Sequence, residues 1–207
     1  MATAATFSRD LGRLKEVANH LGRFQGHLSP TYYDWLTPEY LTKEIGLAEE
    51  VLSKVDQENQ QLQTLKSNRG EARQELYKEF HAVNHAFKAW LYLTDKVDDA
   101  GSYLATTHDV VARVDSLLTA VNRFPDSSNL ASIDLNSLVE SLKKTRQVYL
   151  DSEKAFEEAK AKMPELEKTI IEEADRFDDV FHAVKNALEG AFHDDRDKLK
   201  EVMPWRG

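Results

Sequence analysis

The sequence predicts an all-α protein built as a tandem duplication of a helical repeat with a period of about 100 residues. Three observations support this fold class. Glycine and proline number only 8 and 5 in 207 residues, so tight turns are few and the elements must be long. Apolar residues recur at the three-and-four spacing of amphipathic helices. The same apolar patterns return about 100 residues further along the chain.

A short amphipathic helix opens each copy, and we expect it over residues 8–25 and 107–124. When 5–24 is placed over 105–124, the apolar positions coincide, and each has another apolar position three or four residues away on the same helix face. These positions are Leu11, Leu14, Val17, Ala18 and Leu21 over Val111, Val114, Leu117, Leu118 and Val121. Five identities accompany them, with Ala5, Thr6, Arg13, Arg23 and Phe24 over Ala105, Thr106, Arg113, Arg123 and Phe124.

A long helical segment follows in each copy, over residues 39–97 and 140–191, and carries a residue series with a spacing of seven. The first series is Leu41, Ala48, Val55, Leu62, Arg69, Leu76, Val83 and Trp90. At an offset of 101 it maps onto Leu142, Tyr149, Phe156, Met163, Ile170, Phe177, Val184 and Ala191. A sustained seven-residue repeat predicts a helical bundle with coiled-coil-like geometry, with these positions mostly buried and Arg69 excepted.

The linkers before the long segments contain Pro30 and Pro38 in the first copy and begin at Pro125 in the second. Asp134 is placed as the N-cap of the second long segment. Whether each long segment is one kinked helix or a broken hairpin is open at this point. Ser67–Glu71 offers a plausible cap and breaker, and Pro164 must at least kink a helix. The seven-residue series nevertheless passes both sites without losing phase.

The repeats divide the chain into residues 1–103 and 104–207, as two domains or as one continuous elongated bundle. If the long helices are continuous, the second half of one joins the next short helix and the first half of the next long helix. That is the architecture of spectrin-like three-helix repeats. The analogy concerns geometry alone, because no sequence match to that family accompanies it.

Charge and composition exclude several functions. The formal net charge is −9, and we find no concentrated basic patch of the kind that binds nucleic acid. The acidity concentrates in residues 151–179, while the only basic stripe is Arg9, Arg13 and Arg23. Cysteine is absent, so disulfides, thiolate nucleophiles and cysteine metal sites are excluded. No signal peptide and no apolar run of about 20 residues is present, so we expect a cytoplasmic protein.

The chain also lacks the patterns of known catalytic and cofactor sites. His81 and His85 lie one helical turn apart, but neither has a glutamate three residues before it, and the second copy has Asn186 in place of His85. Neither a nucleophile elbow nor a glycine-rich phosphate loop is present. We therefore expect no catalytic, cofactor or metal site, and no bound cofactor.

Two aromatic segments stand out as candidates for partner binding. Tyr32, Tyr33 and Trp35 lie in the first linker, where they either cap the end of the bundle or anchor a partner. Trp205 lies in the C-terminal tail, where its indole is either folded onto the bundle or presented to a partner.

The sequence therefore favours a non-catalytic structural or interaction protein that assembles with a protein partner or with itself. The alternative is a membrane-surface-associated bundle of the curved, lipid-binding type, which the shortage of basic residues disfavours. A metal-dependent helical-bundle enzyme is the third possibility. The sequence identifies no small molecule that the chain would bind.

Overall fold

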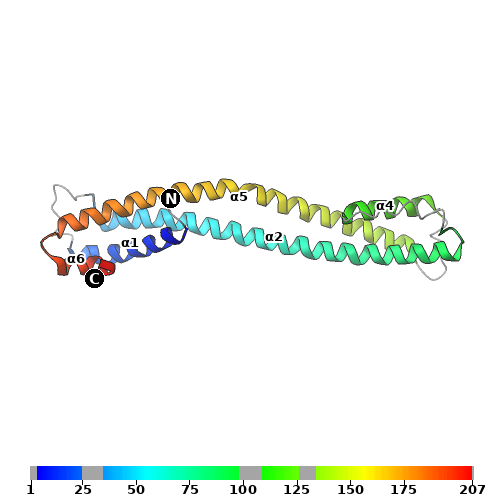
Figure 1. The fold of residues 1–207 in the computed structure, drawn as a ribbon, viewed down its shortest axis with the longest axis horizontal. Coiled ribbons are helices and arrows are strands. Elements are labelled where there is room, and N and C mark those ends of the chain that lie inside the picture. The colour runs from blue at the N-terminus through cyan, green and yellow to red at the C-terminus, as the bar shows by residue number, and fades with distance from the viewer. Residues whose placement is uncertain (1–3, 25–34, 98–108, 126–133, 207) are drawn as a thin grey trace. The chain divides into compact units, whose positions relative to one another are not determined.

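The structure is a computed structural model that describes residues 4–24, 35–97, 109–125 and 134–206 (Figure 1). Every secondary-structure element in these ranges is helical, so the predicted all-α class is confirmed. The helices are α1 (Ala4–Phe24), α2 (Pro38–Leu93), α4 (Val110–Arg123), α5 (Leu135–Ala191) and α6 (Arg196–Val202), and a 3-10 turn covers Pro204–Arg206. No helix in the described part of the chain is long and apolar enough to cross a membrane.

Each of the two long segments is a single helix, so the hairpin alternative is wrong. α2 runs through Ser67–Glu71, where the Ser67 hydroxyl donates a hydrogen bond to the Glu71 carboxylate within the helix instead of capping a new one. Gly70 has helical backbone and open space around it. α5 likewise continues through Pro164. The isolated breakers are overridden because the apolar series on both sides stays in phase and is buried on one face.

The ends of the helices follow from local capping. Thr37 accepts a hydrogen bond from the Tyr40 amide, and Pro38 occupies the first helical position of α2, one residue before the predicted start. Asp134 caps α5 as predicted, accepting from the Ser137 amide at 3.0 Å. α2 stops four residues earlier than predicted, at Leu93. Asp95 there adopts a left-handed conformation with φ of 58°, and the Lys96 amide donates to the Leu91 carbonyl.

The chain forms two compact units whose boundaries differ from those of the sequence repeats. Unit 1 contains residues 1–60 and 162–207, and unit 2 contains residues 61–161. Unit 1 therefore combines α1, the first part of α2, the last part of α5 and α6. Unit 2 combines the rest of α2, α4 and the first part of α5. Each unit thus takes residues from both predicted copies, 1–103 and 104–207.

The core of unit 1 joins α1 to the start of α2, the end of α5 and the C-terminal segment. Phe7 of α1 meets Phe177 of α5 edge-on, with ring centroids 5.2 Å apart. Val202, the last residue of α6, and Met203 directly after it are completely buried in the same core. Its other fully buried large side chains are Leu14, Leu21, Leu36, Leu41 and Leu188.

The core of unit 2 joins the second part of α2 to α4 and the start of α5. Its fully buried side chains include Leu76, Val83 and Phe87 from α2, Val114 and Leu117 from α4, and Leu135 and Leu142 from α5. The rings of Phe87, Trp90 and Phe124 contact one another with centroid distances of 5.6–6.0 Å. No position of the two seven-residue series is exposed in either unit, and Arg69 is half-buried as well.

The burial of Met203 makes the C-terminal segment part of the unit 1 core, which can be tested by mutation. We expect Met203→Ala to lower the free energy of unfolding by about 2–5 kcal/mol, because it leaves a cavity among side chains that cannot collapse fully. Urea unfolding followed by far-UV circular dichroism measures the change. Lys200→Ala, an exposed position of α6, is the control. Equal unfolding midpoints for the two variants would contradict this role of the tail.

Candidate interaction surfaces

The aromatic segment of the first linker is described only at its end. Tyr32 and Tyr33 lie outside the described residues. Trp35 is 38% exposed, and its ring meets Tyr40 edge-on at 5.5 Å, whereas the next residue, Leu36, is buried in the unit 1 core. Trp35 therefore combines an anchored backbone with an accessible indole, as a contact residue at an interface would.

The indole of Trp205 is half-buried against unit 1. Its ring centroid lies 6.2 Å from that of Phe181, and the Arg13 guanidinium lies 5.7 Å from the indole. Arg13 also bonds the buried carboxylate of Asp10 at 3.2 Å. Of the two arrangements open from the sequence, the structure has the one in which the tail folds onto the bundle. Only part of the Trp205 surface is left for a partner.

A third apolar surface, at the end of α2 in unit 2, was not predicted. Tyr92 and Leu93 are 73% and 75% exposed, and Val97 is 36% exposed. The signal was present in the sequence: residues 89–93 are five consecutive apolar residues, and one helix face can bury only some of them. Trp90 and Leu91 face the core, so Tyr92 and Leu93 must face solvent.

Unit 1 contains a polar network between its two long-helix segments. Arg176 of α5 donates hydrogen bonds to Glu44 of α2 and to Glu173 on its own helix. The Glu44 side chain is only 9% exposed. Hydrogen bonds to Glu173 and Glu44 raise the pKa of Arg176 above its ordinary value despite partial burial. Burial and the nearby Glu44 charge also raise the pKa of Tyr40.

Unit 2 has its own polar layer around Arg69, the polar member of the seven-residue series. The Arg69 guanidinium lies 4.1 Å from the Phe156 ring centroid, 3.3 Å from Glu153 and 3.8 Å from Glu157. Burial, with a hydrogen bond to Glu153, raises the pKa of Tyr149 beside it. Arg69 thus occupies a core position because its cation is satisfied by a ring face and two carboxylates.

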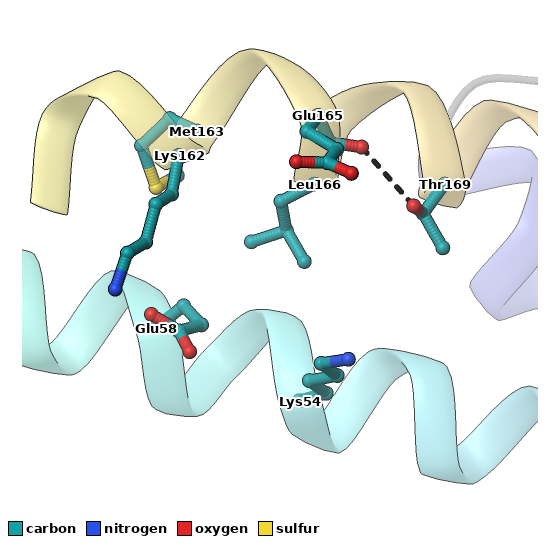
Figure 2. A pocket seen from close by; sticks show the side chains of 7 residues that line it. All are labelled: Lys54, Glu58, Lys162, Met163, Glu165, Leu166 and Thr169. Carbon is teal, nitrogen blue, oxygen red and sulfur yellow. Dashed lines mark hydrogen bonds between the residues drawn. The ribbon is translucent and has the colours of Figure 1, made fainter.

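A shallow groove of about 280 Å³ lies between α2 and α5 within unit 1 (Figure 2). Met163 and Leu166 of α5 form its apolar part, and their side chains point toward α2. The charged rim comprises Lys54, Glu58, Lys162 and Glu165. The hydroxyl of Thr169 is engaged, because it donates to the Glu165 carbonyl at 3.0 Å. This composition suits contact with a charged, partly apolar protein surface better than it suits covalent chemistry.

No cluster of three or more potential metal ligands occurs in the described ranges of the chain. His81 and His85 lie beside each other on α2, with ring centroids 6.2 Å apart. No protein-family model, no curated protein and no solved structure matches this chain. Functional inference therefore depends on the surfaces described above.

The network around Arg176 can be tested by removing its cation. Arg176→Ala leaves the Glu44 carboxylate buried without its partner, so we expect the free energy of unfolding to fall by about 2 kcal/mol or more. Glu44→Gln in the same chain removes the buried charge and should recover part of this loss. Urea unfolding at neutral pH measures both effects. Lys168→Ala, at an exposed pair with Glu172, is the control and should cost at most about 0.5 kcal/mol. Similar losses in Arg176→Ala and Lys168→Ala would refute the role assigned to the network.

Proposed function

We propose that this chain is a non-catalytic interaction protein, a cytoplasmic helical bundle that assembles with a protein partner or with itself. The observation that carries the proposal is the exposed pair Tyr92 and Leu93 at the end of α2. Adjacent apolar side chains with about three quarters of their surface in solvent are costly for an isolated domain, and tyrosine is frequent at interface hot spots. Trp35 in unit 1 is a second exposed aromatic candidate. Tyr32 and Tyr33 stay candidates from the sequence alone.

The proposal includes an origin by tandem duplication with coiled-coil-like packing. Buried positions of the two cores support it, because they recur at the offset found in the sequence. Leu76, Phe80, Val83, Ala86 and Phe87 of α2 precede Phe177, Phe181, Val184, Ala187 and Leu188 of α5 by 101 residues, and all ten are buried. The two units also correspond under this repeat, because α1 and the α2 and α5 segments of unit 1 take the places of α4 and the α5 and α2 segments of unit 2, whereas α6 has no described counterpart.

The contacts of the basic stripe on α1 favour a protein partner over the alternative of an anionic membrane surface. Arg9 and Arg13 both contact the buried Asp10, and Arg23 lies 4.0 Å from Glu201. Arginines that already form ion pairs with carboxylates of the same unit gain less electrostatic free energy from binding to anionic lipid. For the third possibility, a metal-dependent enzyme, the described residues offer the His81 and His85 pair and no cluster of three or more potential ligands.

The exposed pair on α2 provides the test of this function. We expect Tyr92→Ser/Leu93→Ser to weaken binding of the physiological partner at least about tenfold, since hot-spot side chains contribute about 2 kcal/mol or more each. The measurement is cross-linking of the tagged full chain in extracts of its own cells, with partners identified by mass spectrometry and their affinities then measured with purified protein. Val148→Ser/Ile171→Ser is the matched control, because these apolar residues are 58% and 50% exposed but isolated.

Two results would count against the proposal. Unchanged binding by Tyr92→Ser/Leu93→Ser would show that this surface is not the interface. A chain that cross-links to no protein, and instead binds anionic vesicles or purifies with stoichiometric metal lost in His81→Ala, would replace the proposal by one of its alternatives.

A further inference from the structure

One face of the α2–α5 pair in unit 1 is turned away from α1. α1 lies along the side of α2 that carries Glu49, whose carboxylate forms an ion pair with the Lys15 ammonium group of α1 at 2.6 Å. Positions spaced by four, three and four share one face of a helix, so Leu47, Val51, Lys54 and Glu58 lie together on the side of α2 opposite Glu49. Leu47 there is 41% exposed. This face continues into the groove of Figure 2.

The charged side chains around this groove form no ion pairs with one another. Lys54 and Glu58 on α2, and Lys162 and Glu165 on α5, line the groove together. Among the described residues, none of these four side chains has an ion-pair partner, whereas Glu44, Glu49, Lys168 and Arg176 of the same unit are all paired. The groove thus presents two positive and two negative charges around Met163 and Leu166.

The two helices run antiparallel within the unit, which sets the charges at matching levels. The contact of Glu44 with Arg176 places Glu58 at the level of Lys162, and Lys54 at the level of Leu166 and beside Glu165. Figure 2 shows the same arrangement, with Lys162 directed toward Glu58 and Lys54 below Leu166. Each level therefore carries one cation and one anion on different helices.

We infer that this face binds the same face of a second copy of the chain. A two-fold axis parallel to the helices lays α2 of one copy over α5 of the other, so Lys54 meets Glu165 and Glu58 meets Lys162 across the interface. Leu166 packs on the aliphatic stem of Lys54 from the other copy. The product is a four-helix arrangement with antiparallel neighbours. This inference deepens the proposed function by naming one partner.

The size of the face implies weak, concentration-dependent association. The helix from Leu47 to Glu58 is about 18 Å long, and two helices are about 20 Å wide, which gives about 360 Å² per copy. The total of about 700 Å² is below the roughly 1,200 Å² of a stable interface. Charge pairing then decides whether the copies associate.

Charge exchange at this face tests the inference without disturbing the core. In sedimentation equilibrium of the full chain over a wide concentration range, we expect a monomer–dimer equilibrium. Lys54→Glu places a carboxylate opposite Glu165 of the other copy. The repulsion should raise the dimer dissociation constant at least about tenfold. Lys54→Glu/Glu165→Lys restores opposite charges and should return the constant to within about threefold of the parent. Lys168→Glu carries the same charge change outside the groove and should have no effect. Circular dichroism confirms that each variant is folded.

Several outcomes would overturn the inference. If the chain is a monomer at every concentration, the dimer is excluded. If Lys54→Glu leaves the dimer dissociation constant unchanged, the copies associate through another face. Failure of the double exchange to restore association excludes the stated pairing. None of these results bears on binding through Tyr92 and Leu93, so the proposed function is judged separately by its own variants.

Discussion

Burial of apolar residues spaced seven apart along α2 and α5 is the interaction on which the rest of the structure depends. Neither long helix carries enough apolar surface to be stable alone, since its exposed faces are largely charged. In unit 1 the series is covered by α1 and the C-terminal segment, and in unit 2 by α4. The short helices matter because they close these cores.

Polar contacts complement this apolar burial by restricting how the helices can be aligned. Glu44 with Arg176 in unit 1, and Arg69 with Glu153 and Phe156 in unit 2, are satisfied in one register of α2 against α5. A shift by one turn would leave each charge in a half-buried position without its partner, at a cost of several kcal/mol for a buried group. The alternation of apolar seam and polar layer therefore gives each unit its specificity.

Local sequence patterns predicted the helices well, but they could not predict which helix segments pack against one another. The N-cap at Asp134 and the two seven-residue series could be predicted because they depend on neighbours along the chain. The end of α2 was not, because an aspartate at a left-handed position has no strong signature. The Arg176 network and the groove require knowing which residues of α2 oppose α5. Trp205 illustrates the same limit, since only the tertiary structure shows that its indole contacts the Phe181 ring and the Arg13 guanidinium.

The composition of unit 1 from both ends of the chain has a consequence for biosynthesis. Unit 2 is a contiguous segment, residues 61–161, so all of its core is made before residues 162–207 of unit 1. Unit 1 lacks Phe177, Met203 and the rest of its second segment until residues 162–207 have been made. During that interval the apolar face of α1 has only the start of α2 as native cover, and the part that α5 and the C-terminal segment would bury is open to chaperones or to wrong contacts. Contacts of such high sequence separation also form slowly, so α1 is made before the other helices of unit 1 and is among the last of them to be fully buried.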